Sequence, residues 1–506
     1  MIKLRALAEN TKEFSEKHPS LIYKSLGKTG LTVSACGFGA YRTDYRVREH
    51  FEALEYAISQ GINLIDTSAN YSDGGSEILI GNVLEEMISA GSLKREEIVI
   101  VSKGGYIQGK NLEAAKKMKE DGVGYSAVTE YAENIWHCIH PDFLKDQITL
   151  SLERLKLETI DIYLLHNPEY FLDSPLSKDL EPDELRHEYH IRIKRAFEYL
   201  ETEVTAGRIS YYGISSNSFV KSSDDPVFTS LKSCVDAANE ISEENSFYVV
   251  ELPLNLLEKG AIVNKNQVGD SFNVLEYAYE SELGVLVNRP LNALGESGLT
   301  RLADFPVDKE FTTLDEAQII AEINLLDLME EDFIKDHLES IQLSDENRKA
   351  VQAFLKAGEI LKENWKGFGS MENFNDVKKQ FLIPRVNYAF TTLVASPGVT
   401  EEVKDKLDKI ARQTNKLMGI LDSLYGLLAN TKSADLHLRL NKAVDAAEAD
   451  SFKELSLSQK AILFINSLKE VSCTLVGMRQ KRYVDDVIGA LSAAALVDAL
   501  EKFKEI

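Results

Sequence analysis

Four residues near the ends of predicted strands could together deliver a proton to a carbonyl group. Asp66 ends the segment INLID, Tyr71 follows five residues later, Lys103 ends IVIVSK and His166 ends IDIYLLH. A phenol is a poor acid near neutral pH unless a neighbouring charge stabilises its phenolate. Lys103 can supply that charge, Asp66 can hold the ammonium group in place, and His166 can orient the carbonyl oxygen. With a nicotinamide as the hydride source, such a set could reduce a carbonyl by general-acid catalysis.

Each of these four residues has an ordinary structural interpretation when it is considered alone. An aspartate after a strand usually caps a helix or forms a turn, and a lysine at a strand end is usually solvated. A single histidine is more often a satisfied core residue than a catalyst. The set is therefore much more specific than any of its members.

Eight short apolar segments, alternating with amphipathic stretches, would position the four residues. Fully apolar runs of this kind are typical of strands covered on both faces, as in a parallel sheet. The predicted strands are 31–36, 62–66, 98–102, 160–165, 209–214, 247–252, 284–288 and 473–477, and the predicted helices are 48–60, 76–90, 142–156, 188–206, 226–243, 271–282, 457–469 and 483–503. Eight strands, each followed by a helix, predict the α/β class and a (β/α)8 TIM barrel, in which the carboxyl ends of all strands meet at one face.

The alternation breaks after the seventh predicted strand, whose helix begins only near Leu457. The intervening residues predict a large, mainly helical insertion. Apolar residues recur at helical spacing through 314–339, 343–362 and 401–429, and breaks are predicted at Pro384 and at Pro397-Gly398. The predicted domains are a barrel of residues 20–300 and 455–506 and an inserted helical subdomain of residues 301–454.

The predicted insertion follows a barrel strand, and loops after barrel strands emerge at the catalytic face. We therefore expect the insertion to sit over that face and to shape substrate access. Its apolar stripes also need a surface to bury against. A homo-oligomer formed through the insertion, or a binding site for another partner, are the alternatives.

The composition of the chain narrows the class of protein. The 506 residues include 57 Lys and Arg against 81 Asp and Glu, a formal net charge of −24. This acidity argues against nucleic acid or an anionic membrane as the main partner. No apolar run is long enough to span a bilayer, and the first residues lack the apolar centre of a secretory signal. Four scattered cysteines are expected to be free thiols in a reducing compartment, so we expect a cytoplasmic protein.

Three long segments of this sequence resemble the aldo-keto reductase family. They are GINLIDTSANYSDGGSEILIGNVLEE, REEIVIVSKGG and SLERLKLETIDIYLLHNPE. The resemblance covers roughly residues 20–300 and 455–500, while 301–455 has no counterpart. It implies that Tyr71 is the proton donor, that Lys103 and Asp66 adjust the acidity of its phenol, and that His166 positions the carbonyl.

The resemblance also implies an activity: reduction of an aldehyde or ketone, a sugar among the candidates, with NADP as cofactor and NAD as the alternative. The same four residues could equally serve an aldose or alcohol dehydrogenase working in the oxidative direction. A nucleotide-binding regulatory module with little turnover is the alternative from another class.

Cofactor-binding positions follow from the same resemblance. The implied residues are Gly39, Ala40, Tyr41, Ser215, Ser216, Asn217, Glu251, Asn288, Arg289, Gly477, Met478, Arg479, Arg482 and Asp486. Arg479 is placed to bind a 2′-phosphate, with Arg482 in support and Asp486 near the adenine ribose. Two positions depart from the family. Glu251 stands where a glutamine usually binds the carboxamide, and a carboxylate cannot donate to the amide oxygen. Asn288 and Arg289 stand where an aromatic residue often stacks on the nicotinamide.

Two long segments on the catalytic face, residues 104–141 and 167–188, could build a deep or lidded pocket. The candidate lining residues are Trp136, His137, His140, Tyr170 and Phe171. His137 and His140 have no cysteine or carboxylate set at ligand spacing near them, so no metal site is expected. The predicted partner is a small carbonyl or sugar substrate.

Overall fold

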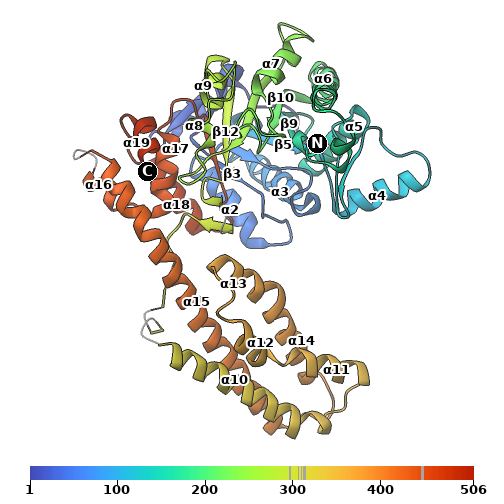
Figure 1. Cartoon of the computed structure of the whole chain (residues 1–506), viewed down its shortest axis with the longest axis vertical. Helices are drawn as coiled ribbons and strands as arrows, with labels where there is room; N and C mark the ends of the chain where they lie inside the picture. The colour runs from blue at the N-terminus through green and yellow to red at the C-terminus, as the bar shows by residue number, and fades with distance from the viewer. Residues whose placement is uncertain (296–297, 306, 309, 312–314, 446–448) are drawn as a thin grey trace. The chain divides into compact units, whose positions relative to one another are not determined.

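Short runs of aliphatic and β-branched residues form the eight strands of a closed parallel barrel (Figure 1). In order around the barrel they are β3 (Cys36–Gly39), β4 (Leu64–Asp66), β5 (Val99–Gly104), β9 (Ile160–His166), β10 (Ile209–Ser215), β11 (Phe247–Pro253), β12 (Gly284–Asn288) and β15 (Cys473–Val476). Their side chains are almost all buried. The predicted (β/α)8 fold is confirmed, and all eight strands direct their carboxyl ends to one face.

Helices surround this barrel in the order that the alternation predicted (Figure 1). They are α2 (Arg48–Ser59), α3 (Gly75–Ser89), α5 (Pro141–Leu155), α6 (Pro182–Thr205), α7 (Leu231–Asn239), α8 (Gly260–Val263), α9 (Val274–Glu280), α17 (Leu457–Asn466), α18 (Lys481–Leu491) and α19 (Ala499–Glu505). The predicted helix 226–243 begins only at Leu231, because Ser230 caps it by accepting from the backbone N–H of Ser233. The predicted helix 483–503 is two helices, α18 and α19.

The structure is a computed structural model. It describes residues 1–295, 298–305, 307–308, 310–311, 315–445 and 449–506. It divides into two compact units, Met1–Gly298 with Leu440–Ile506, and Leu299–Arg439. The first unit contains the barrel, and the second contains most of the predicted insertion. The predicted insertion ends at residue 454, whereas the second unit ends at Arg439.

The first predicted strand, 31–36, was placed wrongly. Its residues Thr32–Ser34 form β2, which pairs antiparallel with β1 (Tyr23–Ser25), and the barrel strand β3 begins only at Cys36. The turn η1 (Gly27–Thr29) connects β1 to β2, and α1 (Ala8–Lys17) precedes them. Leu31 and Val33 pack with barrel residues such as Leu64 and Val99, so this hairpin fills the amino-terminal end of the barrel.

The long segment after β5 is ordered rather than an irregular loop. It contains β6 (Tyr106–Ile107), α4 (Gly109–Glu120), β7 (Thr129–Ala132) and β8 (Ile135–His137), and the three strands form a sheet in the order β6-β8-β7. The segment after β9 contains the short turns η4 (Pro168–Phe171) and η5 (Pro175–Asp179). Further short turns are η2 (Tyr71–Gly74) after β4 and η3 (Arg95–Glu97) before β5. Both long segments therefore present defined side chains at the carboxyl-end face.

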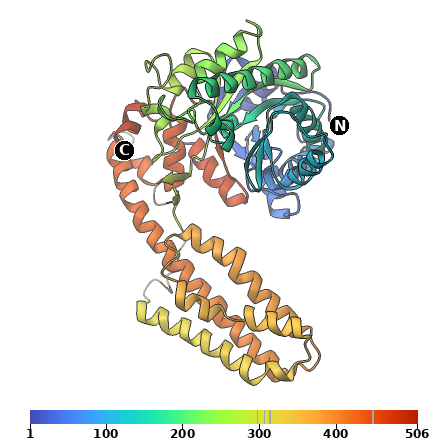
Figure 2. The same ribbon diagram turned by 45° about the vertical axis from the view of Figure 1, so that its right-hand side comes forward.

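The second unit is helical, as predicted. Its elements are α10 (Glu316–Asp336), η6 (Leu338–Ser340), α11 (Asp345–Phe354), α12 (Ala357–Asn364), α13 (Met371–Val377), η7 (Lys378–Leu382), α14 (Ile383–Val394) and α15 (Glu401–Ala443), whose residues from Leu440 onward belong to the first unit. In Figure 2, α10 runs beside α15, where Gln413 donates to the Glu322 carboxylate at 2.7 Å. Three short elements complete the chain: β13 (Asn292–Gly295), β14 (Gly298–Arg301) and α16 (Ala449–Lys453).

Two helix predictions in this unit need correction. Pro384 does not interrupt the helical segment, because the π turn η7 ends at Leu382 and α14 begins at Ile383 and continues through Pro384. A π turn shifts the backbone hydrogen-bond register, which accommodates the missing N–H of proline. The predicted helix 343–362 is two helices, α11 and α12. The predicted helix 314–339 begins at a residue outside the described part of the chain.

Among the described residues, no helix combines the length and the apolar character needed to cross a bilayer.

Candidate active site

The carboxyl ends of three neighbouring strands bring the four predicted catalytic side chains together. Asp66 ends β4, Lys103 lies near the end of β5 and His166 ends β9. The Lys103 ammonium group donates to Asp66 Oδ1 and, at 3.1 Å, to the backbone oxygen of Thr67. The same nitrogen lies 5.3 Å from the centre of the Tyr71 ring. The ring of His166 meets that of Tyr71 edge-on, with centroids 6.0 Å apart.

Tyr71 is held by an unusual stretch of backbone. Ser72 and Asp73 directly after it both adopt left-handed φ angles, 51° and 56°, which few residues other than glycine adopt. Two side-chain contacts hold this turn: Ser72 Oγ donates to the Thr43 carbonyl at 2.6 Å, and Asp73 accepts from the backbone N–H of Lys110. The turn therefore ties the phenol to the segments that follow β3 and β5.

Burial and neighbouring charge set the protonation of this site. Lys103 is fully buried, and although burial alone would lower its pKa, Asp66 and Glu251 raise it above its usual value. Burial raises the pKa of Tyr71, and the charge of Lys103 and its hydrogen bond oppose that rise. Burial, together with Lys103, lowers the pKa of His166 well below its usual value. Near neutral pH the site therefore contains an ammonium group, a protonated phenol and an uncharged imidazole.

The contacts of His166 leave one ring nitrogen for a ligand. Its Nδ1 lies 3.0 Å from Ser68 Oγ, and its carbonyl oxygen accepts from His137 Nε2 at 2.8 Å. Ser68 Oγ donates its one proton to Asn70 Oδ1 at 2.7 Å. When that proton turns to Nδ1 instead, the neutral ring carries its own proton on Nε2 and can donate to a carbonyl oxygen. His137 is likewise kept uncharged, because burial lowers its pKa to about 4.

Aromatic rings extend from the four residues along the segments after β5 and β9. The Tyr106 ring lies edge-on to His166 with centroids 4.7 Å apart, and Tyr170 contacts Tyr106 at 5.1 Å and stacks on His137 at 5.7 Å. On the other side, Tyr41 meets Tyr71 edge-on at 5.2 Å while remaining 63% exposed. A substrate carbonyl near Tyr71 would therefore be next to aromatic surfaces.

Two of the five predicted lining residues contribute to this aromatic wall, His137 and Tyr170. Trp136 instead packs in a small core with Ile107 and Phe143, and Phe171 stacks near Tyr189. His140 is the N-cap of α5, where its Nδ1 accepts from the Asp142 N–H. These three side chains serve local packing or capping.

The predicted nicotinamide residues lie on or directly after strands β3, β10, β11 and β12. Gly39 pairs with Asp66 across β3 and β4, and the Ala40 N–H donates to the Asp66 carbonyl at 2.9 Å. Ser216 Oγ lies 3.0 Å from Ser218 Oγ, and the Asn217 side chain donates to Asn167 at 3.3 Å. Ser215 ends β10, and its carbonyl accepts from the Asn167 N–H at 2.7 Å.

Glu251 and Asn288 form a pair at the ends of β11 and β12. The Asn288 amide donates to Glu251 Oε1 at 2.8 Å, and Glu251 Oε2 lies 3.2 Å from the Lys103 ammonium group. Asn288 Oδ1 is buried and finds no hydrogen-bond partner among the described residues. Arg289, at a left-handed φ of 54°, pairs with Glu258 at 2.9 Å, while its buried Nε is likewise unpartnered there.

A comparison with known protein families identifies the barrel. Residues 35–226 match the model of the Aldo/keto reductase family, and this range contains all four catalytic candidates. The part of the barrel from β3 to β10 therefore matches the aldo-keto reductase family. The resemblance noted in the sequence is therefore confirmed.

Curated relatives match part of this chain. The chain is 28% identical over 149 residues to an NADH-specific methylglyoxal reductase of Escherichia coli, covering 28% of this chain and 40% of that protein. It is 26% identical over 194 residues to an NAD(P)H-dependent D-xylose reductase of Scheffersomyces stipitis, covering 37% of this chain and 50% of that protein. The matches thus span half or less of the length of these relatives.

Solved structures of aldo-keto reductases were also found. The holo form of an enzyme from Bacillus halodurans matches 96% of this chain and 95% of its own, with 14% identity and a TM-score of 0.45. A Klebsiella pneumoniae aldo/keto reductase, solved in complex with NADP and acetate, matches 53% of this chain and 68% of its own, with 18% identity and a TM-score of 0.34.

The predicted adenosine-phosphate residues lie after β15 and on α18. Met478 is fully buried. Burial lowers the pKa of His50, and the nearby charge of Arg479 adds to that shift. Arg482 is exposed and donates to Gln480 at 2.7 Å. Asp486 accepts from Ser456 at 3.0 Å and Ser458 at 2.6 Å, which joins α17 to α18. The proposed ribose contact of Asp486 stays a prediction.

Sequence reasoning missed Glu169 and its neighbours. This carboxyl group is buried on η4, and its Oε1 accepts from the Asn217 N–H at 2.9 Å. Burial raises its pKa to about 7, against the hydrogen bonds that it accepts. Asn167 adopts a left-handed φ of 50°. Its side-chain amide donates to the Tyr106 hydroxyl at 2.6 Å. The signal was the segment HNPE, whose asparagine and proline are typical of a tight turn.

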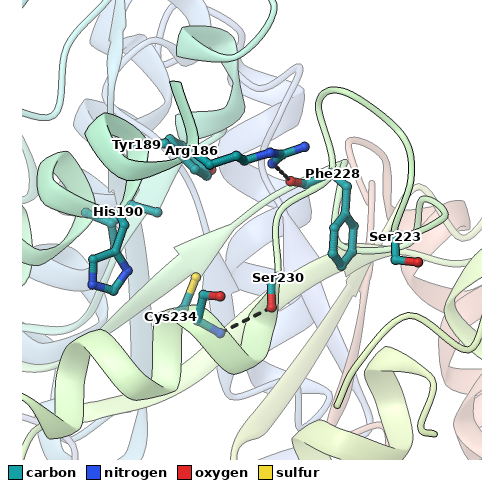
Figure 3. Close-up of a pocket in the computed structure, with 9 residues that line it drawn as sticks. Arg186, Tyr189, His190, Ser223, Phe228, Ser230 and Cys234 are labelled. Carbon is teal, nitrogen blue, oxygen red and sulfur yellow. Dashed lines mark hydrogen bonds between the residues drawn. The ribbon is translucent and has the colours of Figure 1, made fainter. Parts of the chain in front are cut away.

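A cavity of about 210 Å³ lies away from these residues, between α6 and α7 (Figure 3). Arg186 at its edge donates to the carbonyl groups of Phe228, Pro226 and Asp225, and thereby holds the loop before α7. Burial raises the pKa of the Cys234 thiol in its wall, so this thiol stays protonated. Arg186, Tyr189 and Ser230 of this cavity are thus engaged in structural hydrogen bonds, and we place the candidate active site at the strand ends instead.

Proposed function

We propose that this chain is a nicotinamide-dependent reductase that converts an aldehyde or a ketone to an alcohol, with Tyr71 as general acid. The observation that carries the proposal is the cluster at the ends of β4, β5 and β9. There one buried ammonium group contacts both a carboxylate and the face of a phenol, and an uncharged imidazole lies beside that phenol. The NADPH- or NADH-dependent reductases among the relatives support the same activity.

The residues around this cluster fit a nicotinamide cofactor. Asn288 Oδ1 and Arg289 Nε are buried polar atoms that have no protein partner among the described residues. The first can accept a hydrogen bond from a carboxamide, and the second can donate to an anionic or carbonyl oxygen. Ser216 and Asn217, at the end of β10, offer further hydrogen bonds. The cofactor would therefore lie across the ends of β10, β11 and β12, and Arg479 would bind its adenosine phosphate.

Within this proposal, the residues of the chain position a carbonyl oxygen and supply its proton. His166 Nε2 donates a hydrogen bond to that oxygen and orients it toward Tyr71. Tyr71 then transfers its phenolic proton to the oxygen, and Lys103 stabilises the phenolate that is left. Asp66 keeps the ammonium group in position. When bound, the reduced nicotinamide supplies the hydride that reaches the carbonyl carbon.

The substrate class and the cofactor preference are further parts of the proposal. The rings of Tyr106, Tyr170 and Tyr41 favour a substrate with a flat or apolar face, because aromatic side chains gain most from such contacts. Arg479 favours NADP, since a guanidinium group recognises the 2′-phosphate that NAD lacks. NAD remains the alternative cofactor.

A substrate screen tests the proposed function. The chain is incubated with NADPH or with NADH and a panel of aliphatic aldehydes, aromatic aldehydes, ketones and sugars, and cofactor oxidation is followed by absorbance. We expect turnover with at least one carbonyl class and a lower KM for NADPH than for NADH. Tight cofactor binding without turnover on the whole panel would contradict the proposal and favour a nucleotide-binding regulatory module.

A further inference from the structure

Lys103 contacts two carboxylates rather than one. Asp66 accepts from its ammonium group on one side, and Glu251 Oε2 lies 3.2 Å from it on the other. The exposed fractions of the three residues are 0% for Lys103, 4% for Asp66 and 2% for Glu251. By the family resemblance, an uncharged glutamine usually occupies the position of Glu251. This chain therefore adds a buried negative charge beside its candidate catalytic lysine.

The charges around Lys103 do not balance if both carboxylates are ionised. The titratable groups that face the cluster are Asp66 from β4, Tyr71 from η2, Lys103 from β5, His166 from β9, Glu251 from β11 and Cys473 from β15. The phenol, imidazole and thiol are uncharged near neutral pH, because burial raises the pKa of Tyr71 and Cys473 and lowers that of His166. Two carboxylates and one ammonium group then leave one net negative charge in a nearly water-free site, which is costly.

Arg289, the nearby cation on β11's neighbouring strand end, does not neutralise this net negative charge. Arg289, on the strand end next to Glu251, is paired with Glu258 at 2.9 Å. Asn288 is uncharged and donates one hydrogen bond to Glu251 Oε1. Glu251 Oε2 has the ion pair with Lys103 but makes no hydrogen bond among the described residues, so no donor other than Lys103 offsets its charge there. The cheapest way to neutralise the cluster is to bind one proton on the carboxylate pair.

We propose that Glu251 is a second counter-ion of Lys103 and that Asp66 and Glu251 share one proton near neutral pH. Glu251 thereby acts as a positioning residue that sets the proton affinity of Tyr71 through Lys103. The electrostatic part of this inference concerns the protein alone, and its effect on catalysis rests on the proposed function. In support, burial and Glu251 raise the pKa of Asp66, although Lys103 opposes that rise.

The expected consequence has a definite sign. When the shared proton dissociates at alkaline pH, the cluster becomes negative and holds the phenolic proton of Tyr71 more firmly. Reduction requires a protonated Tyr71, so this charge extends reduction toward higher pH. Oxidation of an alcohol would require the phenolate and would begin only at higher pH. The glutamate in place of glutamine therefore favours the reductive direction over a wider pH range.

Infrared spectroscopy of the cofactor-free protein tests the shared proton. Protonated carboxyl groups give a carbonyl stretching band that disappears on ionisation. We compare the wild type with E251Q and D66N, each of which leaves a single carboxylate to pair with Lys103. Near pH 7 we expect one protonated carboxyl group fewer in both variants than in the wild type. Glu169 and Glu330, whose pKa values burial raises to about 7, titrate in all three proteins and cancel in the difference.

E203Q is the matched control for that experiment. Glu203 is also a buried carboxylate with a basic partner, Arg208 at 2.6 Å, but it lies on α6 before the amino-terminal end of β10. Near pH 7, E203Q should show the same carbonyl stretching band of protonated carboxyl groups as the wild type. An unchanged band in E251Q, or in D66N, would overturn the shared proton, because each variant removes one of the two groups that hold it.

The pH dependence of reduction is the second readout. For E251Q we expect the alkaline limb of kcat/KM to move to lower pH by about one unit or more, as is typical when a nearby charge is removed. E203Q should keep the wild-type limb. A limb that does not move would overturn the effect of Glu251 on Tyr71. Absence of turnover in every protein, with the infrared difference intact, would instead contradict the proposed function and leave the shared proton established.

Discussion

Removing the Lys103 ammonium group should cost stability in a pH-dependent way. In K103M the methionine fills most of the lysine's space, but Asp66 and Glu251 lose their common cation at a site that is at most 4% exposed. Breaking a buried ion pair by removing one partner typically costs about 3–5 kcal/mol. We expect a penalty of this size near pH 8, where the unfolded chain has both carboxylates ionised.

The penalty should shrink at lower pH. Burial raises the pKa of Asp66 in the folded state, and K103M removes the positive charge that opposes this rise. Such a group contributes stability at low pH and loses it as the pH rises. Because the wild type already shares one proton between the two, K103M should bind about one more proton on folding. The penalty should therefore grow by about 1.4 kcal/mol per pH unit.

Hydrogen exchange measured by mass spectrometry gives this penalty element by element. Peptides from β4, β5 and β11 should lose protection in K103M, more at pH 8 than at pH 5, while α10 and α15 serve as an internal reference. K17M is a control, because Lys17 is 54% exposed in its pair with Glu97 and such pairs contribute about 0–1 kcal/mol. A penalty equal at both pH values, or no larger than that of K17M, would refute the buried charge cluster.

Three further predictions concern other parts of the chain. R479A should weaken NADPH binding by about tenfold to a hundredfold and NADH binding much less, as measured by fluorescence titration; equal losses would show that Arg479 does not read the 2′-phosphate. Burial raises the pKa of Glu330 to about 7, so hydrogen-exchange protection of α10 and α12 should fall as the pH rises from 4.5 through 7. E330Q should abolish that slope, and a slope that persists would exclude Glu330 as its source. Replacing residues 305–436 with a short Gly/Ser linker should change kcat/KM or the oligomeric state; a variant that folds and keeps both would show that the insertion neither shapes substrate access nor joins subunits.

The sequence was sufficient to predict the barrel and the place of the four catalytic candidates. Strands buried on both faces leave continuous apolar runs, and a polar residue that ends such a run is easily located. Asp66, Lys103 and His166 each end or nearly end a strand in this way. Tyr71 follows on a turn whose distance from β4 is fixed by only a few residues. The site could therefore be assembled from strand ends and spacing.

Other features depend on tertiary contacts that have no local signal. Thr32–Ser34 has the same apolar character as a barrel strand, but it pairs with Tyr23–Ser25 at the amino-terminal end. The proximity of Glu251 to Lys103 depends on the strand order β11, β10, β9, β5 and on side-chain direction across the barrel. The sequence predicts a helix break at Pro384, because proline lacks the backbone N–H that a helix needs. The π turn before it has no signature in the composition. In each case the missing information was which segments meet in space.

The most direct test of the central claim is the kcat of Y71F with the best carbonyl found in the screen. Phenylalanine keeps the ring, and with it the edge contacts to Tyr41 and His166, but it removes the proposed acid. We predict a loss of about 10²–10⁴-fold in kcat, since positioned acids typically contribute this much, with the dissociation constant for NADPH nearly unchanged. A variant that keeps more than about a tenth of the wild-type kcat would contradict the assignment of Tyr71 as the proton donor.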